Sequence, residues 1–143
     1  MFPSNFLSPI PRQGIPGHPF TYLSPLSAPS PLLLSIPLPP SRYRDKHASY
    51  VWNASIVLAD MIANQEIQVE GKRVLELGAG VGLPGIVSAL KGAQTVVLSD
   101  FDDSKMLDDL KDSVDEAVVT SDRYRIQVVG HSFGDSANPL INA

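Results

Sequence analysis

The stretch VLELGAGVGLPG, residues 74–85, joins an apolar run with one acidic residue to four glycines within eight positions. Residues 73–77 have the short apolar pattern of a strand. Pro84 suits the first turn of a helix, where a missing N–H needs no partner. Gly92 suits the end of that helix. The stretch therefore predicts a strand, a glycine turn and a helix over about 83–91.

A second apolar strand is expected at 93–99, followed by Asp100. A strand–helix–strand unit of this length makes two parallel neighbours joined by a right-handed crossover. Ligands of such sheets bind at the carboxyl ends of the strands. Gly78 and Asp100 both fall at that end. Glycines let a backbone approach a ligand closely, the start of the helix presents N–H groups, and the carboxylate can accept hydrogen bonds from both hydroxyls of a ribose.

Two ligand classes compete for this turn. Residues 80–85 satisfy the dinucleotide fingerprint GxGxxG, but a turn that begins at Gly78 puts Leu83 at the third glycine position. Glu76 lies inside the strand, where its carboxylate would repel a pyrophosphate but would attract a cationic amine. S-adenosyl-L-methionine offers an ammonium, a sulfonium and a ribose, without phosphate, so it is favoured over NAD. A solvated Glu76 and a helix-capping Asp100 are the purely structural alternatives.

The remaining globular part alternates helices and one more strand. Residues 48–65 have helical periodicity, with Ser49 as a possible N-cap and Trp52 as a core aromatic or a wall of a cofactor pocket. An amphipathic helix is expected from Phe101 to about residue 118. A third strand is expected at 125–129. His131 follows it and is interpreted as a surface loop residue.

The N-terminal part differs in composition. Residues 1–44 hold 11 of the 13 prolines and no acidic residue, whereas residues 45–143 hold all 15 acidic residues. We expect residues 1–44 to be a disordered Pro/Ser-rich leader and residues 45–143 to form one partial domain. A proline-rich ligand, an organelle transit segment and a wrongly assigned start of the coding sequence are open alternatives for the leader.

Composition excludes several classes of function. The net charge is −4 and the basic residues are scattered, which argues against nucleic-acid binding. The chain has no cysteine, so a disulfide framework, a thiol nucleophile and a cysteine-ligated metal are excluded. No apolar run approaches the roughly 20 residues of a membrane span. We expect a cytoplasmic protein with no metal site, and its oligomeric state stays open.

The segments VLELGAGVGLPGIVSAL, YVWNASIVLADMI and VVLSDFDD together resemble methyltransferase family 16, over about residues 46–140. This family contains protein lysine and N-terminal methyltransferases acting on elongation factors and chaperones. The resemblance implies a Rossmann-like α/β fold, S-adenosyl-L-methionine as cofactor, and a protein substrate such as a translation elongation factor. The cofactor-binding residues that it implies are Trp52, Glu76, Gly78, Ala79, Gly80, Asp100 and Phe133.

Two departures from the family pattern bear on activity. Phe133-Gly134 stands where the family usually has Trp-Gly near the adenine. The fourth strand of the family, with the element that shapes the acceptor pocket, has no counterpart before Ala143. We therefore expect a fold truncated after about three parallel strands, whose bare sheet edge invites association. The residues suggest no group for acceptor chemistry, and a non-catalytic fragment or cofactor-binding remnant is the alternative function.

Overall fold

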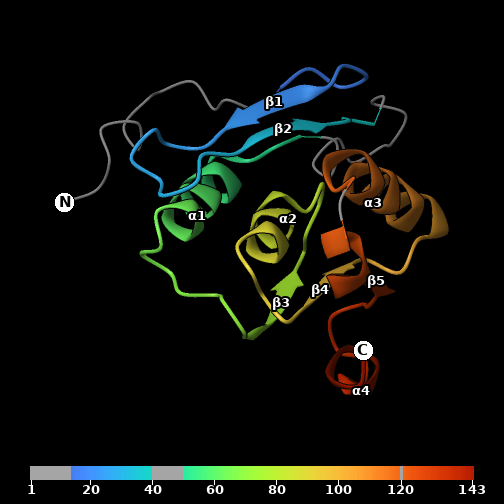
Figure 1. Cartoon of the computed structure of the whole chain (residues 1–143). Coiled ribbons are helices and arrows are strands. Elements are labelled where there is room, and N and C mark those ends of the chain that lie inside the picture. The colour runs from blue at the N-terminus through green and yellow to red at the C-terminus, as the bar shows by residue number, and fades with distance from the viewer. Residues whose placement is uncertain (1–13, 40–49, 120) are drawn as a thin grey trace.

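The computed structural model describes residues 14–39, 50–119 and 121–143, and these form three stacked layers (Figure 1). A two-stranded hairpin covers a layer of helices, which in turn covers one face of a parallel sheet. In chain order the elements are β1 (Phe20–Leu23), β2 (Leu33–Ile36), α1 (Asn53–Ala63), β3 (Arg73–Leu77), α2 (Leu83–Leu90), β4 (Thr95–Asp100), α3 (Ser104–Ala117), a 3-10 helix (Ser121–Arg125), β5 (Ile126–Gly130) and α4 (Asn138–Ile141).

The sheet has the strand order β3-β4-β5, and both neighbouring pairs are parallel. In this register Leu77 lies opposite Ser99, and Asp100 lies opposite Gly130. The carboxyl ends of all three strands therefore meet at one edge. The predicted α/β fold with three parallel strands is confirmed, and the strand predicted at 73–77 has the observed bounds.

Helix α2 lies at the centre of the helix layer. Its sequence, LPGIVSAL, is mostly apolar, and every residue from Leu83 to Ala89 is buried. A Cβ built on Gly85 would lie 2.1 Å from Leu98 Cδ2 on β4. Such a distance is far below van der Waals contact, so this glycine is required for the close packing of α2 on the sheet.

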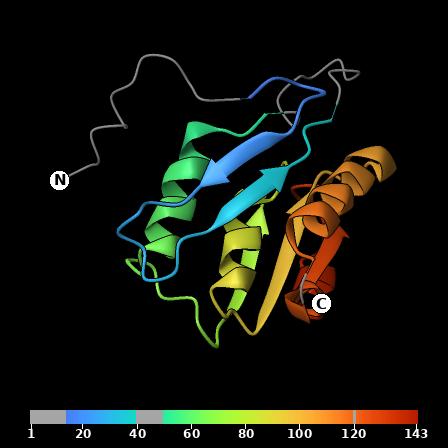
Figure 2. The same cartoon turned by 45° about the horizontal axis from the view of Figure 1, so that its top comes forward.

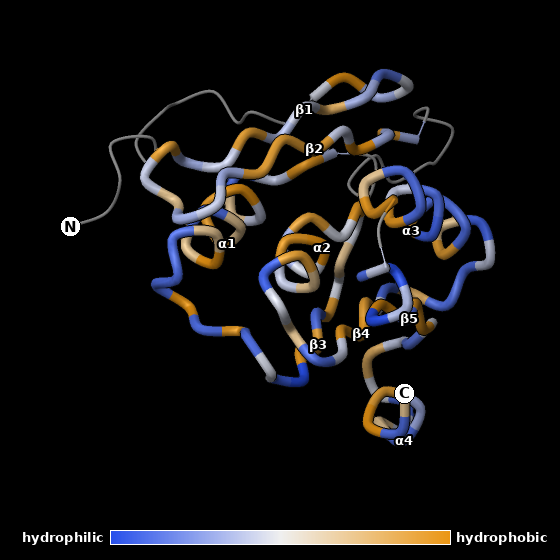
Figure 3. Tube along the Cα trace, viewed as in Figure 1, coloured by the Kyte–Doolittle hydropathy of each residue, from blue (hydrophilic) through white to orange (hydrophobic). Residues whose placement is uncertain are grey.

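Helix α3 closes the other side of the layer with a narrow apolar stripe. Its N-cap Asp103 accepts hydrogen bonds from the backbone N–H groups of Lys105 and Met106, as such caps do. Leu110 and Val114 are buried, while most of the helix is hydrophilic, as its colour in Figure 3 shows. The acidic residues of α3 thus form a solvated face, which agrees with the amphipathic helix expected here.

The prediction of a disordered leader is wrong for residues 14–39. These residues hold β1 and β2, which pair antiparallel with Phe20 opposite Ile36. The hairpin runs across the helices (Figure 2) and its inward side chains belong to the same hydrophobic core as the sheet and α2. Residues 1–13 and 40–44 of the predicted leader lie outside the described residues.

Alternation along the two short strands explains why this proline-rich segment folds. Tyr22, Leu34 and Ile36 point into the core, whereas Leu23 and Leu33 are exposed. The prolines of the segment lie outside the two strands, so their lack of an N–H removes no bond from the ladder.

Polar side chains fasten the hairpin to the helices below it. The Tyr22 hydroxyl donates a hydrogen bond of 2.9 Å to Asp60 Oδ1 on α1. The Ser35 hydroxyl donates one of 3.2 Å to Glu116 Oε1 on α3. Burial raises the pKa of both Tyr22 and Asp60. The hairpin thus fastens two helices that are far apart in the sequence.

Helix α1 begins later than predicted. Its N-cap is Trp52, in an extended conformation, and the predicted cap Ser49 lies outside the described residues. The buried side chains are Ala59, Ile62 and Ala63, so the C-terminal half of α1 packs against the core. None of the helices in the described ranges is long and apolar enough to span a membrane.

Candidate functional site

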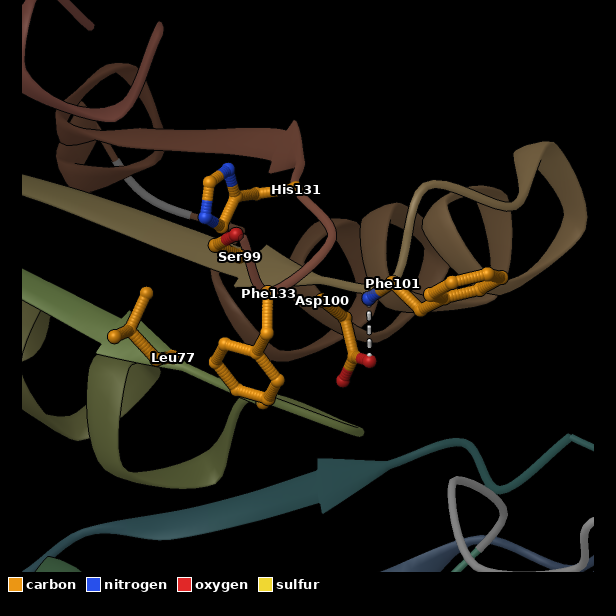
Figure 4. A pocket seen from close by; sticks show the side chains of 7 residues that line it. Leu77, Ser99, Asp100, Phe101, His131 and Phe133 are labelled. Atoms are coloured by element: carbon orange, nitrogen blue, oxygen red, sulfur yellow. Dashed lines mark hydrogen bonds between the residues drawn. The ribbon is translucent and has the colours of Figure 1, made fainter. Parts of the chain in front are cut away.

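A cavity of about 90 Å³ lies where the carboxyl ends of the three strands meet (Figure 4). Its lining comes from the end of β3, the end of β4 and the segment after β5, namely Leu77, Gly78, Ser99, Asp100, Phe101, His131 and Phe133. Gly78, Asp100 and Phe133, three of the residues singled out in the sequence, are therefore brought together.

The glycine turn leaves open space beside the cavity. Gly78, Gly80 and Gly82 have φ of +65°, +55° and +76°. Residues other than glycine rarely adopt this backbone conformation. A Cβ built on Gly78 would meet no atom within 4 Å. The space in front of Gly78 is thus available to a ligand, as the sequence predicted for a turn without side chains.

Asp100 connects the turn to β4. Its Oδ2 accepts a hydrogen bond of 2.6 Å from the Gly80 N–H, and its Oδ1 accepts one of 2.7 Å from the Phe101 N–H. A carboxylate has about four acceptor sites, so acceptor capacity remains for ribose hydroxyls. Asp103, and not Asp100, is the N-cap of the following helix.

More backbone N–H groups of the glycine turn are hydrogen-bonded within the protein than the sequence suggested. The Ala79 N–H donates to the Ser99 carbonyl at 3.0 Å, and the Gly82 N–H donates to the Ala79 carbonyl at 2.8 Å. Together with the Gly80–Asp100 bond, these contacts hold the turn in place against β4. The turn therefore offers shape and space to a ligand more than it offers N–H groups.

Glu76 lies on the α2 side of β3, outside the lining of this cavity. Its Oε2 accepts a hydrogen bond of 2.8 Å from the Gly85 N–H in the first turn of α2. Burial, above all, raises the pKa of Glu76 to about 7; the Gly85 bond opposes the rise, and the negative charge of Asp100 adds to it. A cation placed beside Glu76 would favour its ionised form.

A second, larger hollow of about 590 Å³ runs along the outer edge of β3. We call it the β3 groove. Its walls come from α1, from residues 67–78 and from the start of α2, and include Leu58, Ile62, Glu76 and Pro84. Leu77 and Gly78 line both this groove and the smaller cavity, so the two spaces meet at the end of β3.

The two aromatic residues implied by the resemblance lie differently. Phe133 is 85% exposed and lines the cavity, with its ring beside Leu77 and Asp100 in Figure 4. Trp52 is 41% exposed at the start of α1 and lines neither the cavity nor the β3 groove. Of these two residues only Phe133 lies at the cavity, whose lining also includes Phe101.

Sequence reasoning missed part of the lining. His131 lies in the loop after β5, as predicted, and it also lines the cavity beside Ser99 (Figure 4). The signal for it is the parallel register, because Asp100 lies opposite Gly130 and the next residue must emerge at the same edge. Within the residues that the structure describes, no group of three or more His, Cys, Asp or Glu side chains could hold a metal ion.

Comparisons with known proteins identify the family of the chain. A family model described as "Lysine methyltransferase" matches residues 41–130, which is more than half of the chain. The chain therefore belongs to the lysine methyltransferase family, and the predicted resemblance is confirmed. S-adenosyl-L-methionine is the cofactor that this membership implies.

Curated relatives match the same part of the chain. A protein N-terminal and lysine N-methyltransferase EFM7 from Cryptococcus neoformans is 37% identical over 92 residues, covering 64% of this chain and 31% of the relative. Its namesake from Schizosaccharomyces pombe is 41% identical over 96 residues, covering 66% and 36%. The chain thus matches about a third of the length of these relatives.

One solved structure, an RNA methyltransferase by its description, comes from Pyrococcus horikoshii. It is 28% identical with a TM-score of 0.42, covering 55% of this chain and 35% of that one.

Proposed function

We propose that this chain binds S-adenosyl-L-methionine at the carboxyl ends of β3, β4 and β5, as part of a protein N-methyltransferase. The observation that carries the proposal is the cavity between Gly78 and Asp100, held together by the Gly80–Asp100 hydrogen bond of 2.6 Å. The cavity of about 90 Å³ is smaller than the roughly 300–1,000 Å³ of typical ligand pockets. We therefore assign the cavity itself to the ribose.

The rest of the cofactor would extend in two directions from this point. Asp100 accepts hydrogen bonds from the ribose hydroxyls. The adenine lies against the exposed ring of Phe133. The methionine end passes Gly78, which both spaces share, and brings its ammonium toward Glu76 in the β3 groove. In this arrangement Trp52 has no contact with the cofactor.

When bound, S-adenosyl-L-methionine supplies an electrophilic methyl group on a sulfonium. The lone pair of an acceptor amine forms the new N–C bond while the S–C bond breaks and leaves a neutral thioether. The amine has to lose one proton to solvent beforehand, so the protein need only hold donor and acceptor in line. We accordingly assign binding roles to Asp100, Gly78 and Glu76, and no general base.

The acceptor proposed for the whole protein is an amine of a polypeptide, either a lysine side chain or an N-terminus. The names of the EFM7 relatives support this substrate class. A translation elongation factor in the cytoplasm is the specific partner that we propose. The net charge of −4 disfavours a nucleic-acid substrate. Residues 45–143 supply every side chain that we assign to the cofactor.

Calorimetric titration of the full chain with S-adenosyl-L-methionine tests the binding site. Two charge-assisted hydrogen bonds are worth roughly 1.5–3 kcal/mol each, so Asp100→Ala should weaken binding by at least about 100-fold. Asp112→Ala, an exposed carboxylate on α3, is the matched control and should leave the affinity unchanged.

Because Asp100 also holds Gly80 and Phe101, thermal melting has to show that the variant is folded. A folded Asp100→Ala protein with wild-type affinity, or a folded wild type that releases no heat with millimolar ligand, would refute the proposed site.

A further inference from the structure

We propose that Ser99 and His131 donate hydrogen bonds to the ribose hydroxyls of the bound cofactor, from the side of β4 opposite to Asp100. The two side chains would make the cavity selective for a ribose that carries both hydroxyls. This role rests on the proposed function, because it assigns two further residues to the same cofactor site.

The Ser99 hydroxyl is a buried polar group that lacks a partner. Only 1% of the Ser99 surface is exposed, and its side chain lines the cavity (Figure 4). Among the residues that the structure describes, no group forms a hydrogen bond with this hydroxyl. A buried hydroxyl without a hydrogen bond costs free energy, because nothing replaces its bonds to water. A ligand atom in the cavity would supply the missing partner.

Strand β4 places Ser99 and Asp100 on opposite sides of the same ligand space. Successive side chains of a strand point to opposite faces of the sheet. Asp100 faces the glycine turn, where its Oδ2 accepts the Gly80 N–H at 2.6 Å, so Ser99 faces the other way. Both side chains line the cavity, since they are the last two residues of β4. A sugar over the end of this strand would therefore meet both.

His131 is the second donor on this side of β4. It directly follows β5, and its backbone N–H donates to the Asp100 carbonyl at 2.9 Å. The imidazole lines the cavity next to Ser99 (Figure 4), and within the described residues it has no hydrogen-bond partner. An imidazole carries at least one N–H whether it is neutral or protonated, so it can donate to a ligand in either state.

The chemistry of a ribose requires donors in addition to Asp100. An ionised carboxylate only accepts hydrogen bonds, so Asp100 binds the protons of the two ribose hydroxyls. Each hydroxyl oxygen then keeps lone pairs that need a donor once the sugar has left water. Backbone N–H groups beside the cavity are already engaged. Those of Gly80 and Phe101 donate to Asp100, and that of Ala79 donates to the Ser99 carbonyl.

The lining of the cavity holds two side chains that can donate. Of its seven residues, Ser99 and His131 alone have a side-chain O–H or N–H. Their number matches the two hydroxyls of a ribose. A site that hydrogen-bonds a hydroxyl rejects an analogue without it, because the donor of the site is then left unpaired. Selectivity for the intact ribose follows from this arrangement.

Calorimetric titration of the full chain with S-adenosyl-L-methionine and with its 2′-deoxy and 3′-deoxy forms tests the role of Ser99. Ser99→Ala should weaken the binding of S-adenosyl-L-methionine by about 5-fold, the value of one neutral hydrogen bond. With the deoxy form that lacks the contacted hydroxyl, the same substitution should change the affinity by less than about 2-fold. A substitution that merely distorted the cavity would weaken all three ligands alike.

The role of His131 is tested in the same assay. His131→Leu should weaken S-adenosyl-L-methionine by about 5-fold as well, and this effect should also disappear with one of the two deoxy forms. His131→Gln, which keeps an N–H donor, should restore the affinity to within about 2-fold of the wild type. Equal losses in His131→Leu and His131→Gln would overturn the assignment of His131 as a donor.

Two further variants serve as controls. Ser113→Ala on α3, at an equally buried serine outside the cavity, should leave the affinity for all three ligands unchanged. Thermal melting has to show that Ser99→Ala is folded. If it is not, Ser99→Cys takes its place and should give the same pattern, because a thiol has similar volume and is a weaker donor.

Two results would overturn the role of Ser99 and leave the proposed function standing. The first is a folded Ser99→Ala protein that binds S-adenosyl-L-methionine as tightly as the wild type, since water would then serve the ribose. The second is an equal loss of affinity for all three ligands, since Ser99 would then act through packing. A folded wild type that binds none of the three ligands would overturn both this role and the proposed cofactor site.

Discussion

Replacing Glu76 by glutamine should make the protein more stable at neutral pH than the wild type. The Glu76 carboxyl is held among apolar groups on the α2 side of β3, and its Oε2 accepts the Gly85 N–H at 2.8 Å. Glutamine has nearly the same shape and can accept that bond through its amide oxygen. The substitution therefore removes the charge while keeping the contact.

The magnitude follows from the raised pKa of Glu76, which is about 7 in place of an ordinary 4.5. At roughly 1.4 kcal/mol per unit of pKa, this difference corresponds to about 3.4 kcal/mol. Glu76 keeps part of its surface exposed, and solvent screening reduces the effect, so we expect about 2 kcal/mol.

The direction in which pH changes the free energy of unfolding depends on whether the folded or the unfolded chain binds the proton more tightly. Below pH 4.5 the carboxyl is protonated in both the folded and the unfolded chain, and it costs no stability. Between pH 4.5 and about 7 the unfolded chain ionises while the folded chain keeps its proton, so the free energy of unfolding falls as pH rises. Above that range the loss is constant.

Urea unfolding of the full chain, followed by circular dichroism between pH 4.5 and 8, measures this effect. The difference in unfolding free energy between Glu76→Gln and wild type should grow by about 2 kcal/mol across the range. Glu70→Gln, at an exposed position before β3, is the control for general charge effects. A Glu76→Gln difference that does not change with pH would refute the assignment of a buried, proton-retaining carboxyl.

Three further substitutions test the packing and the proposed site. Gly85→Ala should lower the unfolding free energy by about 1–3 kcal/mol, because its Cβ would lie 2.1 Å from buried Leu98; wild-type stability in urea would contradict this packing. Ile36→Ala should cost about 2–5 kcal/mol and Leu26→Ala, 85% exposed, less than about 0.5 kcal/mol; equal small effects in the same assay would mean that the hairpin is not part of the core. Phe133→Ala should weaken S-adenosyl-L-methionine by about 5- to 150-fold, the value of one base stacked on an aromatic ring, without changing the melting temperature; unchanged calorimetric affinity would remove Phe133 from the adenine site.

Local patterns accounted for the part of the fold that surrounds the glycine turn. The strand at 73–77 and the helix after it were predictable, because an apolar run, positive-φ glycines and a proline near the helix start each constrain a few adjacent residues. The parallel crossover then placed Gly78 and Asp100 at one edge without further information. The candidate cavity between them was therefore within reach of sequence reasoning.

The β1–β2 hairpin was not predictable from the sequence. Prolines over residues 14–39 indicated an extended, unfolded segment, whereas the strands between them are only four residues each. A period-two pattern of that length is a weak signal by itself. Tyr22 and Ile36 are ordered because α1, α2 and α3 together present an apolar surface that the hairpin covers. That surface does not exist until the helices have packed.

The sequence by itself determined the strand, the glycine turn and the carboxylate of the next strand, since each depends on neighbours along the chain. Tertiary structure alone decided that Asp100 accepts a hydrogen bond from the Gly80 N–H and that His131 lines the cavity. It also decided that Glu76 points toward α2 and lines the β3 groove, and that a proline-rich segment completes the core. The physical reason is that these contacts join residues distant in the chain, and their free energy comes from burial and hydrogen bonds that form only when separate elements pack together.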